Sequence, residues 1–193
     1  MTPILLATSA ALVWGTSDFC GGKGAQRAHA LTVTVISQLA ALPLLAVGLL
    51  AIPGVARVAD LGWGMVAGAA GLVGVLLLYR GLAGGAMVVV SPVTAVTAAV
   101  VPLLVGLVTD GGLHPLGLLG SACAIGAIGL VSAGPSGSAR IQSRIGRLVG
   151  LALLAGTMFG IFFIIVGQAH PDSGLWVLVG ARLSSIPLGL LLL

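Results

Sequence analysis

Long apolar stretches, interrupted only by short polar turns, constrain this chain more than any other feature of its sequence. Each stretch has roughly 20 residues, enough for a helix to cross a hydrocarbon core of about 30 Å. The seven stretches are residues 3–22, 31–52, 61–83, 87–108, 113–133, 148–168 and 174–193. Their hydrophobicity is continuous and does not alternate, which favours helices over the strands of a membrane barrel. The sequence therefore predicts an all-α, polytopic membrane protein with about seven transmembrane helices.

The composition excludes a soluble enzyme, a nucleic-acid-binding module and a disordered chain. Of 193 residues, 59% are hydrophobic and only 6% are charged, and glycine supplies 31 more. A soluble domain carries charge on about a quarter of its residues, because those charges cover the surface that faces water. Basic turns between spans account for the net charge of +4. We therefore expect a lipid bilayer around the chain and no nucleic-acid partner.

The chemistry-bearing residues form no catalytic or metal-binding pattern. The three histidines fall in three different turns, without the spacing of metal ligands. The two cysteines form no CxxC pair. The Gly-Gly-Lys-Gly run at 21–24 lacks the first glycine and the final Ser or Thr of a phosphate-binding loop. We expect no enzyme, no metal and no cofactor, and no direct use of ATP.

Glycines recur at helical spacing within several spans. The pairs are Gly64 and Gly68, Gly71 and Gly74, and Gly156 and Gly160. Small residues on one helix face let two backbones approach closely, which matters where the surrounding lipid is as apolar as the helix. This spacing predicts a tightly packed helix bundle.

Two parts of the chain resemble each other at a nearly constant offset of about 144 residues. Leu39, Pro43 and Leu44 correspond to Leu183, Pro187 and Leu188. One span earlier in each copy, Trp14-Gly15 corresponds to Phe159-Gly160. The match favours an internal duplication, although apolar sequences also match by chance. With five spans in each copy, an odd number, the second copy enters the membrane from the opposite side.

Motifs in the first, third and fourth predicted spans resemble those of a known family. They are Trp14-Gly15, Leu78-Tyr79-Arg80, the run Ser91-Pro92-Val93-Thr94-Ala95-Val96-Thr97, and Pro102. Together they resemble the first repeat of an EamA-domain transporter of the drug/metabolite transporter superfamily. That resemblance implies ten helices, built as two inverted five-helix repeats around a central cavity.

The resemblance also implies a function and a location. It assigns residues 1–145 to a first five-helix repeat and residues 146–193 to the first two helices of an incomplete second repeat. The expected protein is a multi-pass permease or exporter of small organic metabolites or drugs, in the plasma membrane, here the inner membrane of a bacterium. It would work by alternating access.

The alternative is an inactive truncated remnant, or a membrane subunit that needs a partner and transports nothing alone. A homodimer or further C-terminal helices would then complete the cavity.

Charged residues inside the spans are candidates for a substrate site, because each is costly in lipid unless it is paired or faces a cavity. Trp14 and Asp18 share one helix face. Asp18 either meets a cation or proton, or pairs with Lys23 at the end of the span. Arg80 either binds an anionic group or extends to the interface. Arg182 lies deeper, about eight residues into its span, which favours a functional or pairing role.

Hydroxyl groups mark one face of the fourth span. Ser91, Thr94 and Thr97 can bind a substrate or, as is commoner in membranes, a neighbouring helix. Pro102 removes a backbone hydrogen bond in mid-helix and is the predicted hinge. Gln38 stands where the second copy has Arg182, a residue type that the family often shows there. The predicted cavity-lining set is Trp14, Asp18, Gln38, Tyr79, Arg80, Ser91, Thr94, Thr97 and Arg182.

The orientation of the chain is predicted in two opposite ways. On one face of the membrane fall the cations Lys23, Arg27, Arg80, Arg140, Arg144 and Arg147. Only Arg57 falls on the other face. The positive-inside rule places the cation-rich face in the cytoplasm and the N-terminus outside. The family resemblance implies an N-terminus inside and the 134–147 segment outside, and both orientations stay open.

Overall fold

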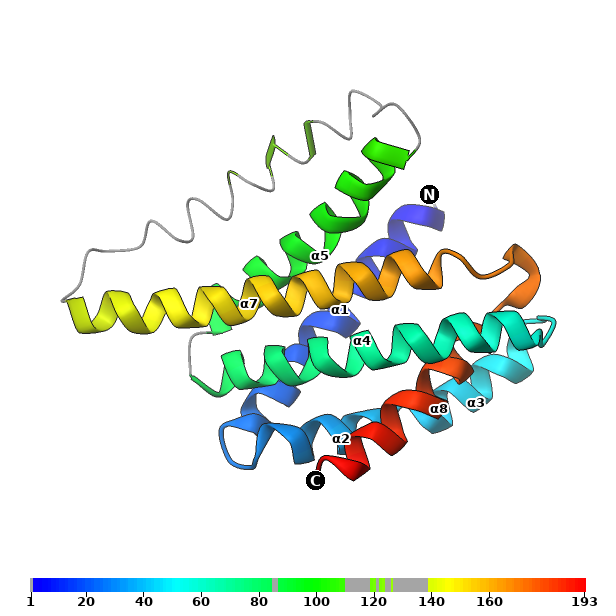
Figure 1. Cartoon of the computed structure of the whole chain (residues 1–193), viewed down its shortest axis with the longest axis horizontal. Helices are drawn as coiled ribbons and strands as arrows, with labels where there is room; N and C mark the ends of the chain where they lie inside the picture. The colour runs from blue at the N-terminus through cyan, green and yellow to red at the C-terminus, as the bar shows by residue number, and fades with distance from the viewer. Residues whose placement is uncertain (1, 85–86, 110–118, 121, 124–125, 127–138) are drawn as a thin grey trace.

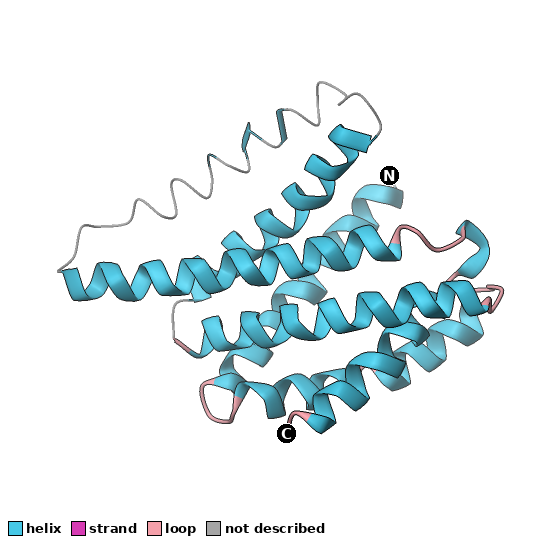
Figure 2. Ribbon diagram, in the orientation of Figure 1, coloured by secondary structure: helices cyan, strands magenta, loops and turns pink. Residues whose placement is uncertain are grey.

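The computed structural model describes residues 2–84, 87–109, 119–120, 122–123, 126 and 139–193. Throughout these residues the regular structure is helical, without strands, which confirms the all-α prediction for this part of the chain (Figure 2). The helices are α1 (Thr2–Ala25), α2 (Ala30–Ala40), α3 (Leu42–Ala51), α4 (Val58–Ala83), α5 (Met87–Thr109), α7 (Ala139–Val166) and α8 (Trp176–Leu191), and a 3-10 turn, η1 (Pro171–Ser173), precedes α8.

Four helical segments are long and apolar enough to cross a membrane. They are Ala30–Ala51, Val58–Ala83, Met87–Thr109 and Ile145–Val166, while α8 is apolar but shorter. Many large apolar side chains on these helices point outward; Leu50 is 91% exposed and Val88 is 84% exposed. Such a surface is costly in water but ordinary in lipid, so these helices are typical of a membrane protein. The span predicted at 113–133 falls outside the described residues, apart from a few isolated positions.

The second predicted span, residues 31–52, is confirmed as one apolar helical segment, Ala30–Ala51. Within it a single turn residue, Ala41, separates α2 from α3. Pro43 lies in the first turn of α3, where its missing N–H and fixed φ are tolerated, whereas inside a helix it clashes with the preceding turn. Pro187 is accommodated inside α8, so the same residue type gives different outcomes at the two matched positions.

Two helices extend beyond the predicted spans. Helix α4 begins at Val58, three residues before the predicted start, and α7 begins at Ala139 although a turn was expected up to residue 147. Apolarity marks only the part of a helix inside the lipid, and the basic first turns of α7 continue the helix past that boundary. Before α8, Gly174 has a φ of +55°, a backbone conformation that glycine adopts without steric cost.

Helix α4 lies at the centre of the bundle (Figure 1). It packs against α8 on one side and α7 on the other, and α5 packs against α7. A Cβ on Gly68 would collide with the backbone carbonyl of Ala181, and one on Gly156 would lie 2.5 Å from the Cβ of Thr97. Glycine is therefore required at both close approaches, which confirms the tight packing predicted from the glycine spacing.

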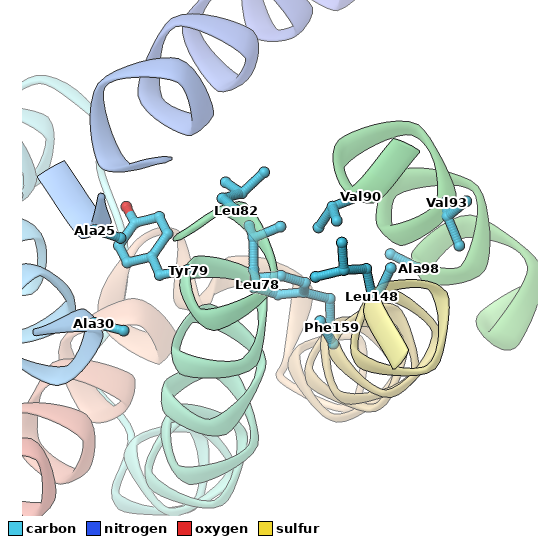
Figure 3. Packing of buried hydrophobic residues seen from close by; sticks show 12 residues of the cluster. Ala25, Ala30, Leu78, Tyr79, Leu82, Val90, Val93, Ala98, Leu148 and Phe159 are labelled. Atoms are coloured by element: carbon cyan, nitrogen blue, oxygen red, sulfur yellow. The ribbon is translucent and has the colours of Figure 1, made fainter. Parts of the chain in front are cut away.

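Hydrogen bonds and an apolar cluster reinforce these helix pairs. Ser184 Oγ of α8 donates to the carbonyl of Met65 in α4 at 2.7 Å, and Thr94 Oγ1 of α5 donates to the carbonyl of Ala152 in α7 at 3.2 Å. Figure 3 shows the buried cluster where α4, α5 and α7 meet. Its members include Leu78, Tyr79, Leu82, Val90, Val93, Leu148 and Phe159.

The connecting segments before α4 and before α8 are bonded to each other at the end of the bundle where α4 begins. The backbone N–H of Val55 donates to the carbonyl of Asp172 at 2.9 Å. The backbone N–H of His170 donates to Oδ1 of the buried Asp60 at 3.0 Å. Arg57 Nη2 lies 3.9 Å from Asp172 Oδ2. These bonds join the segment before α4 to the segment before α8.

Replacing Gly68 by alanine should destabilise the bundle, because the added Cβ must push α8 away from α4. The expected loss is about 1–3 kcal/mol, the usual cost of overpacking. Thermal unfolding of the purified protein in detergent would measure it. Gly62→Ala is the matched control, since a Cβ there meets no atom within 4 Å. Equal unfolding temperatures for the two variants would contradict the close α4–α8 contact.

Candidate functional site

A cavity of about 510 Å³ lies between α1, α2, α4, α7 and α8. Its polar and aromatic lining consists of Trp14, Ser17, Asp18, Ser37, Gln38, Tyr79, Phe159, Phe162, Phe163, Arg182 and Ser185. Small residues, among them Gly68 and Gly71 of α4 and Ala181 of α8, and several larger apolar residues also line it. The cavity is partly open to the outside of the bundle, and Trp14, in its wall, is 53% exposed.

Two opposite charges line this cavity. Asp18 and Arg182 are its charged lining residues among those described, and no ion pair joins them within this part of the chain. Asp18 Oδ2 accepts a hydrogen bond from Ser91 Oγ at 2.7 Å. The predicted alternative, a pair between Asp18 and Lys23, is wrong. Lys23 Nζ instead lies 5.9 Å from the centroid of the Phe19 ring.

Further polar groups line the same cavity. Ser185 is 1% exposed, and its Oγ has no hydrogen-bond partner. A buried hydroxyl without a partner costs about 1–3 kcal/mol. Ser37 Oγ donates to the carbonyl of Thr34 in its own helix, and Gln38 is buried beside it. Because Ser185 lines the cavity, a rotation of its side chain would present the unpaired hydroxyl to water or to a polar solute.

Ser185 was missing from the sequence prediction. Its position three residues after Arg182 places both side chains on one helix face, and that spacing is the signal that identifies it.

Aromatic rings form another wall of the cavity. The ring centroids of Trp14 and Phe159 lie 6.3 Å apart in an edge-to-face arrangement, with an interplanar angle of 79°. Phe163 lies 6.3 Å from Trp14 and 5.4 Å from Phe162. Such ring pairs are mutually stabilising. This wall offers an apolar surface to any solute that enters.

Tyr79 lies where α4 meets α1. A Cβ on Gly21 would collide with the Tyr79 ring, so the absence of a side chain on α1 makes room for the phenol. The tyrosine is nearly fully buried and still lines the cavity. Trp14, Asp18, Gln38, Tyr79 and Arg182, all predicted from the sequence, therefore meet at one cavity.

Three other predicted residues, all hydroxyls, lie away from the cavity lining. Ser91 reaches it only through its bond to Asp18. Thr94 bonds the carbonyl of Ala152 in the neighbouring helix, and Thr97 bonds the carbonyl of Val93 in its own helix at 2.7 Å. Each hydroxyl thus has a partner within the bundle, which is the commoner use of such groups in membranes.

Arg80 and Pro102 also lie elsewhere. Arg80 is exposed and lines a second pocket at the end of α4, because its side chain points to a different face of the helix from that of its neighbour Tyr79, which lines the cavity. Pro102 is inside α5, and its Cδ would lie 3.3 Å from a Cβ added to Gly160 of α7. The proline therefore lies in the α5–α7 contact, and its role as a hinge stays a prediction.

Metal ligands do not gather in the described residues: no group of three or more His, Cys, Asp or Glu side chains could hold a metal ion there. The cavity offers charge, hydrogen bonds and aromatic surface for reversible binding of a solute.

Comparison with known proteins finds no matching family model, no matching curated protein and no matching solved structure.

Proposed function

We propose that this protein is a multi-pass membrane transporter that moves small organic solutes by alternating access, without ATP. The observation that carries the proposal is the polar lining of the cavity, in which Asp18, Arg182 and Ser185 lie among apolar helices. Ionisable groups within membrane helices are costly and mark solute or ion pathways. A cavity of about 510 Å³ falls within the usual range for small-molecule sites.

The lining favours a solute that combines charge with an apolar body. A carboxylate would pair with Arg182, an ammonium group would pair with Asp18, and Ser185 would supply one further hydrogen bond. The aromatic wall around Trp14 would hold the apolar part. Zwitterionic amino acids with apolar side chains have this combination.

We propose the same arrangement of spans that the sequence predicts. The protein has about seven spans, with a five-helix repeat over residues 1–145 and the start of an inverted repeat over 146–193. It lies in the inner membrane of a bacterium. The contact between Trp14 and Phe159 supports the repeat, because these matched residues pack against each other in the cavity wall. Alternating access in such folds comes from one repeat moving against the other.

Arg182→Ala should lower solute uptake about tenfold or more, because the loss of one charge-assisted hydrogen bond exceeds about 1.4 kcal/mol. The assay is uptake of a panel of labelled apolar amino acids by vesicles that contain the full chain. Arg57→Ala removes the same charge from the connection before α4 and should retain normal uptake. Equal activity of the two variants would exclude Arg182 from the site. Uptake no faster than in protein-free vesicles would favour the inactive or partner-dependent alternative.

Ser185→Ala should raise the KM for uptake and leave the unfolding temperature unchanged or slightly higher. The serine hydroxyl has no partner within the protein, so its removal leaves no other group unsatisfied and only the solute loses a hydrogen bond. Ser9→Ala is the control, because the Ser9 hydroxyl is exposed and bonds only the carbonyl of Leu5 in its own helix. A marked loss of stability without a change in KM would show a structural role for Ser185 instead.

A further inference from the structure

A second pocket of about 480 Å³ lies at the end of the bundle where α4 ends. It is shallow and open, and α1, the turn before α2, α4 and α7 all contribute to it. Its lining consists of Ala25, Ala28, His29, Ala30, Arg80, Ala83, Arg147 and Leu151. Three basic side chains thus surround a floor made largely of alanine, and the pocket is separate from the central cavity.

The basic groups of this pocket have no acidic partner in the described part of the chain. The ion pairs found there are those of Arg57 and His170 with Asp172, near the opposite end of α4. Asp18 is bonded to Ser91 beside the central cavity. Arg80 and Arg147 are both exposed and line the same pocket, with no acidic partner for their charges among the described residues. Two guanidinium groups around one open space favour an anion there.

The place of the pocket along the bundle indicates which anion can reach it. Arg80 lies in the last turn of the apolar span Val58–Ala83, so its guanidinium reaches the boundary between hydrocarbon and water. Lys23, in the last turn of α1, and Arg27, in the turn that follows, lie near the same end (Figure 1). Lipid phosphates lie at this depth in a bilayer, where basic pockets between helices bind anionic headgroups.

We propose that this pocket binds the phosphate of an anionic phospholipid, with Arg80 and Arg147 donating hydrogen bonds to the phosphate oxygens. The planar guanidinium matches phosphate geometry and can donate two parallel bonds. The small side chains of Ala28 and Ala83 leave room for the glycerol beside it. The same chemistry would fit a soluble phosphate, but the boundary position favours the lipid. This site is independent of the transport proposed for the central cavity.

The test measures lipid bound to the full chain by native mass spectrometry, from detergent micelles doped with phosphatidylglycerol or phosphatidylcholine. The wild type should retain phosphatidylglycerol and bind it about tenfold more tightly than phosphatidylcholine. Arg147→Gln should remove most of this preference, and the Arg80→Gln/Arg147→Gln double variant should abolish it. Arg147→Lys keeps the charge but loses the paired donors, so it should retain only part of the preference.

Arg57→Gln is the matched control, since it removes one charge at the other end of the bundle and should leave the lipid preference intact. Because Arg80 and Arg147 are exposed, the variants should keep the wild-type helical circular dichroism. Equal losses in Arg57→Gln and Arg147→Gln would show an effect of net charge alone and overturn the site. Displacement of the lipid by excess inorganic phosphate would assign the pocket to a soluble anion and overturn the lipid as its ligand.

Discussion

The contact between α4 and α8 depends on the missing side chains of Gly64 and Gly68. A Cβ at either position would collide with a backbone carbonyl of α8, that of Val177 or that of Ala181. In lipid the hydrophobic effect does not drive helices together, so such close packing and interhelical hydrogen bonds must do so. The bond from Ser184 to α4 adds to this contact. This contact holds in place the two polar cavity residues of α8, Arg182 and Ser185.

Glycines of α4 also determine how closely the aromatic wall of the cavity, on α7, approaches. A Cβ on Gly71 would lie 3.1 Å from Phe162, and one on Gly74 would lie 3.3 Å from Phe159. These glycines therefore let the aromatic rings of α7 approach α4 closely. Because α5 packs on α7, Ser91 can reach Asp18 across the bundle. The glycines of α4 thus bring the aromatic rings of α7 and the basic group of α8 close to one space.

Much of this arrangement could be predicted from sequence, since apolarity and glycine spacing are local signals. The helix positions and the close-packed glycines follow from them, as does the choice of Asp18 and Arg182. Partners could not be predicted, because they depend on which helices become neighbours. Asp18 therefore bonds Ser91, which is far away in the sequence, although Lys23 is the nearer partner along the chain. The one-residue interruption at Ala41, just before Pro43, could not be predicted either, because Pro187, in a matched context, leaves its helix uninterrupted.

Transport through the space around Asp18 and Arg182 requires that water fill this cavity inside a bundle surrounded by lipid. Single cysteines at Ser37, which lines the cavity, and at Leu39, which is exposed outside it, would test this requirement. Both lie at similar depth on α2, and Cys20 and Cys123 would be replaced by alanine. In vesicles, a small charged thiol reagent should modify Ser37→Cys but not Leu39→Cys, because a thiol in hydrocarbon does not ionise. An unreactive Ser37→Cys, or equal modification at both positions, would contradict the account.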